Sequence, residues 1–368
     1  MRVLVTGARG FLGRNLVARL KRIEEYEPLS FDVQNDAAEL PALLAVADVV
    51  VHLAGVNRPQ DPAEFLAGNL GLTESIAGIL EKTGRAIPII LASSIQATQA
   101  NEYGKSKLAA EERLELYSQG SGAGVRIFRF ANVFGKWCRP NYNSVVATFC
   151  HNIAHGLPIQ INDPDWPIQL VYIDDVVAAI LREIAGKSQG FGFAEAGPVH
   201  EITVGALASL IYGLEEARHT SILPDFANPL VKKLNSTYLS YLEMAQLPLA
   251  ANLKSDERGW LFELIKSHTA GQIFVSTTKP GKKRGNHYHD TKVEKFCVIS
   301  GQARISFRLV DSNQRHYIDV NGSNIQIIDI PPGYTHSIEN TGEVDCVTLF
   351  WANEIFNPAL PDTYFLEV

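Results

Sequence analysis

Three histidines and one glutamate in the C-terminal third of the chain have the residue types and spacing of metal ligands. His287 and His289 stand two positions apart, so their side chains would share one face of a β-strand. Glu294 follows a short polar break, where a returning strand would bring its carboxylate opposite the histidines. His336 opens a strand after a Pro-Pro-Gly turn. Two histidines alone would suit any polar strand face, but three imidazoles with a carboxylate favour a divalent ion such as Zn²⁺.

The spacing around these residues resembles the two signature motifs of the cupin superfamily, whose small β-barrels bind a metal through the matching positions. The first motif is matched by Gly281, His287, His289, Glu294 and Gly301, and the second by Pro331, Gly333, His336 and Asn340. The glycine expected shortly before the second motif is absent, because Gly322 is too far upstream. The resemblance implies one divalent metal, expected to be Zn²⁺, with four ligands: His287, His289, Glu294 and His336.

The segments that must position these ligands have the pattern of short strands separated by glycine turns. This pattern predicts an all-β barrel or sandwich, which we place at residues 248–368. Strands are expected at residues 262–266, 272–277, 295–299, 303–309, 325–330 and 346–351.

The composition limits the classes of function. The 368 residues are enough for two domains, and 46% hydrophobic with 20% charged residues is the balance of an ordinary globular protein. A net charge of −7 argues against nucleic acid or an anionic membrane as the main partner. Four cysteines without Cys-x-x-Cys spacing suit a reducing compartment, and neither a membrane span nor a signal peptide is evident. We therefore expect a cytoplasmic protein.

The N-terminal segment has the pattern of a dinucleotide-binding unit. An apolar strand at Arg2–Thr6 is followed by Gly7, Gly10 and Gly13, and then by a helical stretch to about Leu20. Glycines at these positions let the backbone approach a pyrophosphate, which would bind the amides at the helix N-terminus.

The residues themselves leave open whether the cofactor carries a 2′-phosphate. Asp32 ends the second strand, where a carboxylate can bond the adenosine ribose and favours NAD. Arg9 and Arg14 instead offer bidentate partners for the additional phosphate of NADP.

Strands and helices continue to alternate beyond this unit, with near-continuous apolar strands at Asp48–Gly55 and Ile87–Leu91. Such strands are typical of a parallel sheet that is covered on both faces. The alternation predicts a doubly wound, Rossmann-type α/β domain with its ligands at the carboxyl ends of the strands. We place this domain at residues 1–247.

A second set of reactive residues lies in Tyr103-Gly-Lys-Ser-Lys107. On a helix, positions four apart share a face, so Lys107 would lie beneath Tyr103. A nearby ammonium lowers the pKa of a tyrosine and prepares the phenol to exchange a proton near neutral pH. Ser94, at a strand end, could hold a substrate oxygen beside the same phenol.

These residues resemble the extended short-chain dehydrogenase/reductase family, which is rich in nucleotide-sugar enzymes. Further matching segments are Leu53-Ala-Gly55, Asn69 in Gly-Asn-Leu-Gly, Arg129-Phe-Ala-Asn132-Val-Phe-Gly135 and Val171-Tyr-Ile-Asp-Asp-Val176. The resemblance implies a catalytic set of Ser94, Tyr103 and Lys107, with Asn132 near the sugar. The cofactor contacts that it implies are Gly7, Arg9, Gly10, Phe11, Leu12, Gly13, Asp32, Leu53, Ala54, Gly55, Tyr103 and Lys107. One departure is that only eight residues separate Ser94 from Tyr103, which implies a trimmed substrate-side loop.

The segment after residue 135 offers candidate nucleotide contacts. Trp137, Arg139 and Tyr142 combine stacking surface with positive charge, as contacts to uracil and a diphosphate require. Each would equally suit packing beneath a loop. Arg139 is the expected phosphate contact.

Three further segments, Lys136–Ser144, Ser236–Tyr241 and Pro361–Val368, together with the cupin motif, are similar to those of one family. Over its full length the chain resembles this family of bifunctional enzymes of capsular polysaccharide synthesis. The resemblance implies metal-dependent epimerisation at C3 of UDP-2-acetamido-2,6-dideoxy-β-L-arabino-hexos-4-ulose in the cupin. Reduction at C4 with NADPH would then give UDP-2-acetamido-2,6-dideoxy-β-L-talose, on the route to UDP-N-acetyl-L-fucosamine. A UDP-linked 4-keto amino sugar as partner and a homodimer are implied as well.

Two alternatives remain open. One is a monofunctional 4-keto nucleotide-sugar reductase whose cupin is a structural, dimerising metal-binding module, which a closed four-ligand site would favour. The other keeps both activities on a different nucleotide or sugar. The base for the epimerisation is also open among Tyr288, Lys292, Lys295 and Tyr334.

Overall fold

The computed structural model describes residues 1–57, 61, 63–186 and 188–368, which divide into two compact units. The α/β unit comprises Met1–Tyr212 and Asn228–Leu242. The β unit comprises Glu243–Val368 together with Gly213–Ala227. A functional boundary between residues 247 and 248 stays a prediction.

A six-stranded sheet of order β2-β1-β3-β4-β5-β8 forms the centre of the α/β unit, and each of these pairings is parallel. Its strands are β1 (Arg2–Thr6), β2 (Glu27–Phe31), β3 (Val49–His52), β4 (Ile89–Ser94), β5 (Val125–Phe130) and β8 (Phe191–Ala194). Strands β2 and β3 lie on opposite sides of β1, so the crevice in which this architecture binds ligands lies at the carboxyl ends of β1 and β3.

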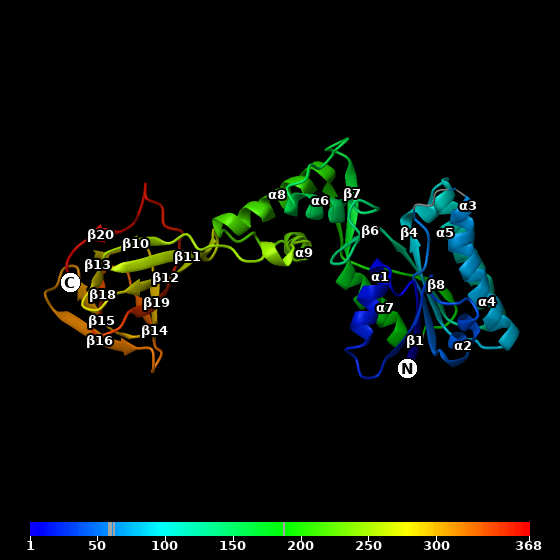
Figure 1. Cartoon of the computed structure of the whole chain (residues 1–368), viewed down its shortest axis with the longest axis horizontal. Coiled ribbons are helices and arrows are strands. Elements are labelled where there is room, and N and C mark those ends of the chain that lie inside the picture. Colours follow the sequence, from blue (N-terminus) through cyan, green and yellow to red (C-terminus); the bar gives the residue numbers. More distant parts are fainter. Residues whose placement is uncertain (58–60, 62, 187) are drawn as a thin grey trace. The chain divides into compact units, whose positions relative to one another are not determined.

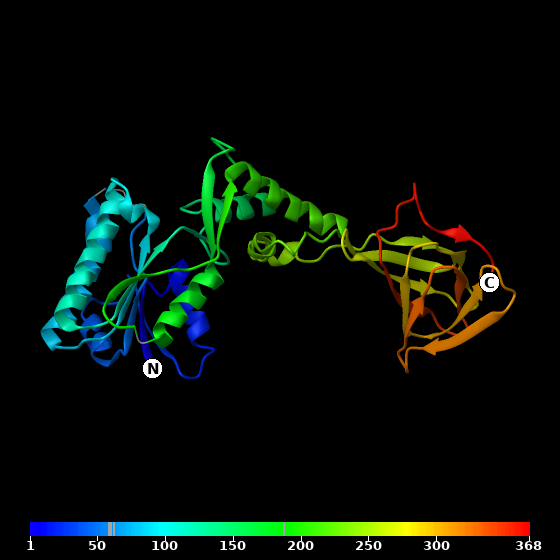
Figure 2. The same ribbon diagram turned by 180° about the vertical axis from the view of Figure 1, so that it is seen from behind.

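Helices cover both faces of this sheet because its strands are apolar on both sides. Val3 and Val5 of β1 pack with α1 and α7, whereas Leu4 packs with α2, α4 and α5 on the other face. Figures 1 and 2 show these two groups of helices on opposite sides of the sheet. The helices of the chain are α1 (Phe11–Leu20), α2 (Glu39–Val46), α3 (Ala63–Leu66), the π-helix η1 (Ala67–Gly71), α4 (Leu72–Thr83), the 3₁₀ helix η2 (Ile95–Thr98), α5 (Glu102–Ser121), α6 (Val145–Ala154), α7 (Ile173–Gly186), α8 (Val204–Thr220), α9 (Pro229–Leu239) and the 3₁₀ helix η3 (Met244–Gln246).

A small sheet of order β6-β7-β9 completes the α/β unit, with β6 (Asn132–Phe134), β7 (Pro167–Tyr172) and β9 (Val199–Thr203). The prediction of a parallel α/β domain is confirmed, although β3 is shorter than the predicted strand 48–55. The chain turns across the end of β1 after His52, and the Ala54 amide donates to Thr6 Oγ1 (3.3 Å). The sequence did not predict helix α9, which Asn228 caps by accepting from the Leu230 amide (3.0 Å).

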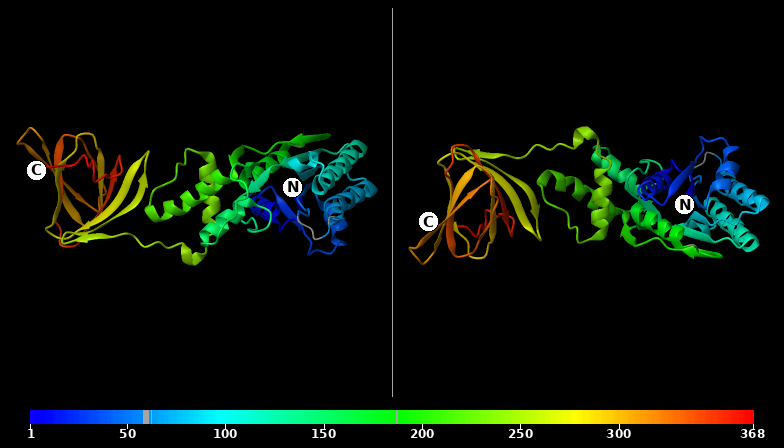
Figure 3. Two further views of the ribbon diagram at one scale, coloured as in Figure 1. Left: turned by 90° about the horizontal axis from the view of Figure 1, so that it is seen from above. Right: turned by 90° about the horizontal axis from the view of Figure 1, so that it is seen from below.

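Two antiparallel sheets form the β unit, and Figure 3 shows their yellow-to-red strands from two directions. The first has the order β10-β11-β12-β19-β14-β17, with β10 (Lys254–Asp256), β11 (Gly259–Ser267), β12 (Gly271–Thr278), β19 (Cys346–Ala352), β14 (Glu294–Ser300) and β17 (Ile327–Ile330). The second has the order β16-β15-β18-β13-β20, with β16 (Arg315–Asn321), β15 (Gln302–Leu309), β18 (Tyr334–Asn340), β13 (Lys283–Tyr288) and β20 (Tyr364–Phe365).

Side chains of both sheets form one core, which includes Phe296 and Phe350 from the first sheet and Ile305, Phe307 and Ile338 from the second. The prediction of an all-β architecture is confirmed. Strand β16 lies outside the predicted strands, because it is an edge strand and its burial pattern lacks a regular alternation. No described helix has both the length and the apolar character needed to cross a membrane.

Candidate functional site

The turn after β1 holds the predicted glycines against the neighbouring backbone. Gly7 has φ +64°, and a Cβ there would lie 2.8 Å from the backbone of Ala54. A Cβ at Gly13 would lie 2.1 Å from the Gly7 carbonyl oxygen, so α1 packs against the turn only because this position is glycine. Gly10 is the N-cap of α1 and provides no side-chain cap, which leaves the amides of the first turn available to an anion.

Asp32 follows β2 and lies beside the same turn. Its carboxylate accepts hydrogen bonds from the amides of Arg9 (2.7 Å) and Val33 (2.8 Å). Arg9 is exposed, whereas the Arg14 guanidinium stacks 4.3 Å from the centre of the Trp137 ring. Of the two arginines, Arg9 is therefore the one whose backbone amide contacts Asp32.

Tyr103 stands in the first turn of α5, and Lys107 lies one turn later on the same face. Lys107 Nζ is 5.9 Å from the centre of the Tyr103 ring and donates to the Ala92 carbonyl (3.3 Å). Burial raises the pKa of Tyr103, and a hydrogen bond with the Ser94 side chain opposes this shift. The predicted lowering of this pKa is therefore wrong, because burial of the phenol outweighs the hydrogen bond with Ser94.

The connection from Ser94 to Tyr103 is short but brings the two side chains together. Strand β4 ends at Ser94, and η2 turns the chain back. Asn101 then caps α5 by accepting from the Gly104 amide (2.7 Å). A Cβ at Gly104 would lie 2.2 Å from the Gln96 carbonyl oxygen, so glycine allows α5 to pack directly on η2.

The charge of Lys107 is set by its surroundings. Burial lowers the pKa of Lys107 to about 8, and Glu111, one turn further along α5, opposes this shift. Glu111 is itself buried and accepts from Arg129 Nε (3.0 Å) and Nη2 (2.6 Å). A Cβ at Gly55 would lie 2.9 Å from Lys107 Nζ, so glycine is what gives the ammonium its space on that side.

Further polar residues that the sequence did not assign to the site surround this lysine. His52 bonds Thr6 Oγ1 through Nδ1 (2.7 Å) and Thr73 Oγ1 through Nε2 (2.9 Å). Burial, followed by the charge of Lys107, lowers the pKa of His52 to about 3, which keeps this imidazole neutral. Asn69 in η1 accepts from the Val56 amide (3.0 Å) and donates to the Val56 carbonyl (3.1 Å). The only sequence signals for these roles were the family match of Asn69 and the four-residue spacing of Glu111 from Lys107.

The two predicted substrate contacts are exposed. Asn132 opens β6 and donates from Nδ2 to the Gln169 carbonyl (3.0 Å). The Arg139 guanidinium lies 5.0 Å from the centre of the Tyr142 ring. Their roles toward a sugar and a phosphate stay predictions.

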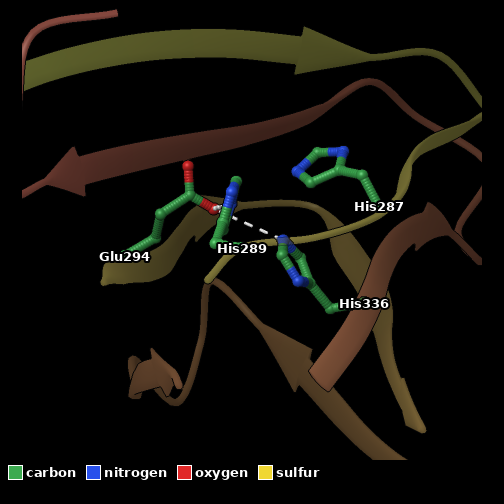
Figure 4. A group of neighbouring side chains, drawn as sticks. All are labelled: His287, His289, Glu294 and His336. Atoms are coloured by element: carbon green, nitrogen blue, oxygen red, sulfur yellow. Dashed lines mark ion pairs between the residues drawn. The ribbon is translucent and has the colours of Figure 1, made fainter. Parts of the chain in front are cut away.

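The four predicted ligands of the β unit lie together, and Figure 4 shows their side chains turned toward one another. His287 lies in β13, His289 directly follows this strand, Glu294 opens β14 and His336 lies in β18. The antiparallel register places His287 directly opposite His336. The ligand atoms of all four residues lie within 4.8 Å of one another.

Hydrogen bonds determine which imidazole nitrogens face the centre of this cluster. His289 Nδ1 is 2.6 Å from the Asp362 carbonyl oxygen, and His336 Nδ1 is 3.2 Å from the Tyr334 carbonyl oxygen. A carbonyl only accepts, so both Nδ1 atoms carry a proton and both Nε2 atoms present lone pairs. Each Nε2 lies 3.3 Å from Glu294 Oε2.

Three atoms of this cluster are suited to bind a metal because they are buried and lack hydrogen-bond partners. His289 Nε2, His336 Nε2 and Glu294 Oε2 are buried without a hydrogen-bond partner. Their 3.3 Å spacing is close to the ~3.4 Å that separates ligand atoms around a tetrahedral Zn²⁺ with bonds of about 2.0–2.1 Å. Burial lowers the pKa of His287 to about 4, so this imidazole is neutral as a ligand must be. Burial raises the pKa of Glu294, but hydrogen bonds from His289 and His336 in their doubly protonated form outweigh it and bring the pKa to about 2.

Of the four candidate bases, Tyr334 is the one on the ligand-bearing face of its strand. It stands two residues before His336 in β18, and the bond from the Gly333 amide to the His289 carbonyl (2.9 Å) brings this end of β18 beside His289. The other three have partners elsewhere: the Tyr288 ring packs on Tyr364 (5.2 Å), Lys295 pairs with Asp329, and Lys292 donates to the Pro361 carbonyl (2.7 Å).

Two known families match separate parts of the chain. Residues 3–191 match the NAD dependent epimerase/dehydratase family, and residues 254–364 match the polysaccharide biosynthesis C-terminal domain. The UDP-2-acetamido-2,6-beta-L-arabino-hexul-4-ose reductase of Pseudomonas aeruginosa is 45% identical over 368 residues, which are 100% of this chain and 99% of that protein.

Solved structures agree with these matches. The UDP-glucuronic acid 4-epimerase of Bacillus cereus, in complex with UDP-glucuronic acid and NAD, shares the fold over 59% of this chain and 83% of its own, with a TM-score of 0.53 at 18% identity. The capsular polysaccharide assembling protein CapF from Staphylococcus aureus superposes with a TM-score of 0.94 at 44% identity, covering 100% of both chains. The family predicted from the sequence is confirmed: this chain belongs to the CapF family, which joins an NAD-dependent epimerase/dehydratase domain to a polysaccharide biosynthesis C-terminal domain.

Proposed function

We propose that this chain is a bifunctional nucleotide-sugar enzyme. A cupin at residues 248–368, within its β unit, epimerises C3 of UDP-2-acetamido-2,6-dideoxy-β-L-arabino-hexos-4-ulose. Its α/β unit, within residues 1–247, then reduces C4 with NADPH to UDP-2-acetamido-2,6-dideoxy-β-L-talose. The identity of 45% with a reductase named for the 4-ulose supports the second step. The observation that carries the first step is the set of buried, unpartnered lone pairs around Glu294 Oε2.

The order of the two steps follows from the chemistry of the ketone. A hydrogen at C3 is acidic only while C4 is a carbonyl, because the carbanion left at C3 delocalises onto the carbonyl oxygen. Reduction at C4 removes this acidity and fixes the configuration at C3. Epimerisation must therefore precede reduction.

In the β unit, His287, His289, Glu294 and His336 would hold the metal, for which Zn²⁺ is the best match. When bound, the metal supplies Lewis-acid stabilisation of negative charge on a carbonyl oxygen. Tyr334, acting as the phenolate on the ligand-bearing face of β18, takes the C3 proton, and a proton from solvent adds to the opposite side of the carbon.

In the α/β unit, the Gly7–Gly13 turn with the amides of Phe11 and Leu12 would hold the pyrophosphate of the dinucleotide. Asp32 and Arg9 would hold its adenosine ribose and 2′-phosphate. When bound, NADPH supplies the hydride. The Tyr103 hydroxyl gives its proton to the oxygen at C4, Ser94 orients this oxygen, and the Lys107 ammonium stabilises the phenolate that remains. Leu53–Gly55 would line the cofactor, and Asn132 and Arg139 would contact the sugar and the diphosphate.

Replacing Tyr103 by phenylalanine should lower the rate of C4 reduction by about 10²–10⁴-fold, because the general acid is removed. NADPH oxidation measures the effect, and deuterium uptake at C3 should continue. Tyr212→Phe, at an exposed tyrosine of the same unit, is the control and should reduce at the wild-type rate. Wild-type reduction by Tyr103→Phe would show that another group donates the proton.

The pH profile of the reduction should reflect Lys107. Burial lowers its pKa from 10.5 to about 8, so the ammonium is present below this pH and is lost above it. The reduction rate should therefore fall as the pH rises through about 8. Glu111→Gln removes the charge that raises this pKa and should move the fall to lower pH. NADPH oxidation measured from pH 6 to 10 gives both profiles. Identical profiles for the wild type and Glu111→Gln would contradict this role of Lys107.

Removing the metal with a chelator should stop deuterium uptake at C3 in D₂O, measured by mass spectrometry without NADPH. Added Zn²⁺ should restore the uptake in the wild type but not in His336→Ala, which lacks one ligand. His268→Ala, at an exposed histidine of the same unit, is the control. Persistence of uptake in folded His336→Ala would show that exchange at C3 does not depend on this metal site and would contradict the proposed epimerisation in the β unit.

Tyr334→Phe should lower deuterium uptake at C3 by about 10²–10⁴-fold while Zn²⁺ still binds, because only the proton-transferring oxygen is lost. Tyr317→Phe, at an exposed tyrosine of the edge strand β16 of the same sheet, should exchange like the wild type. If both variants exchange equally fast, the base is a different residue.

A further inference from the structure

The last residues of the chain close around the metal ligands. Asp362 lies 68 residues beyond Glu294 in the sequence, yet its carboxylate caps the turn that joins His289 to Glu294. Asp362 Oδ1 accepts from the Asp290 amide (2.9 Å), and Oδ2 accepts from the amides of Thr291 (3.0 Å) and Lys292 (2.8 Å). The Thr291 hydroxyl also donates to Oδ2 (2.9 Å). Four donors thus converge on one carboxylate.

The backbone of the same residue contacts a ligand directly. The Asp362 carbonyl accepts from His289 Nδ1 at 2.6 Å, which leaves the Nε2 lone pair facing Glu294. Asp362 has φ +36°, in the left-handed region that aspartate and asparagine tolerate better than most residues. One residue therefore fixes both the orientation of His289 and the turn that leads to Glu294.

Neighbouring residues of this segment attach it to the other ligand-bearing strands. Strand β20 pairs with β13, with Phe365 opposite His287. The Leu366 carbonyl accepts from Thr335 Oγ1, next to His336 in β18. In return, the buried Lys292 ammonium donates to the Pro361 carbonyl (2.7 Å) and to Thr363 Oγ1 (3.2 Å). The C-terminal segment thus contacts each segment that carries a histidine ligand.

We propose that residues 361–368 are the positioning element of the metal centre and that Asp362 is its main positioning residue. This inference rests on the proposed function, since it assumes that the four side chains bind a metal. Asp362 is not a ligand: its carboxylate is occupied by the amides of the turn, and it acts through His289 and Glu294. Partners of this kind typically contribute 10–100-fold to metal affinity.

Asp362→Asn tests the proposal in the full-length protein. Asparagine keeps the size and tolerates the backbone conformation, but its amide nitrogen would meet the amide hydrogens of the turn. Competition with a chromophoric chelator should give a Zn²⁺ affinity about 10–100-fold below that of the wild type, at one ion per chain. Asp345→Asn, the same chemical change at an exposed position of the β unit outside residues 361–368, should bind within about twofold of the wild type.

A second measurement separates positioning from mere folding. With Co²⁺ in place of Zn²⁺, the visible absorption of Asp362→Asn should change in position and intensity, because the ligand geometry is altered. A variant that only folded less well would bind less Co²⁺ with an unchanged spectrum per bound ion. If Asp362→Asn does not fold, Thr291→Ala, which removes one of the four donors, should show a smaller loss of Zn²⁺ affinity in the same direction.

The outcomes distinguish this inference from the one on which it rests. A wild type that binds neither Zn²⁺ nor Co²⁺ would overturn the metal site itself. A wild type that binds Zn²⁺ tightly, with equal affinity and an equal Co²⁺ spectrum in Asp362→Asn, would overturn the positioning role alone. Unchanged affinity in Thr291→Ala would do the same where Asp362→Asn is unfolded.

Discussion

The β unit depends on a buried carboxylate oxygen that faces two imidazole lone pairs. Glu294 Oε2 lies 3.3 Å from His289 Nε2 and from His336 Nε2, and none of the three atoms has a hydrogen-bond partner. Taking a carboxylate out of water costs several kcal/mol unless opposite charge compensates for it. Either imidazole could donate to this oxygen only after taking up a second proton, because its Nδ1 proton is already committed to a carbonyl. Protons and a metal ion therefore compete for the same space.

The strand register that creates this centre is set by an irregularity in β13. Gly285 pairs with Ser337, but His287 pairs with His336, so Asn286 is an extra residue that forms a β-bulge. A Cβ at Gly285, where φ is +94°, would lie 2.7 Å from the His336 carbonyl oxygen, so the bulge requires glycine. Without the extra residue, the face that bears His287 would be reversed. The bulge also turns the Asn286 carbonyl toward the Leu366 amide (2.9 Å), which docks the C-terminal segment.

What the sequence could predict was the part of each site that follows from local spacing. The two-residue spacing of His287 and His289, and the four-residue spacing of Tyr103 and Lys107, map directly onto a strand and a helix. The role of Asp362 could not be predicted in this way, because its contacts are to backbone amides about 70 residues away, and any residue type supplies an amide. The raised pKa of Tyr103 was missed for a similar reason: burial depends on the whole fold and not on spacing.

Burial accompanies opposite protonation states in the two candidate sites. Around Glu294, burial keeps water away from lone pairs, and the depressed pKa values of Glu294 and His287 keep both groups free of protons, as metal binding requires. Around Tyr103, burial raises the pKa of the phenol and lowers that of Lys107 to about 8, so the phenol holds its proton more firmly than the neighbouring cation does. A phenol that keeps its proton until the reaction can donate it there, and the ammonium compensates for the phenolate as it forms. Burial therefore favours a fixed charge arrangement in the β unit and a transferable proton in the α/β unit.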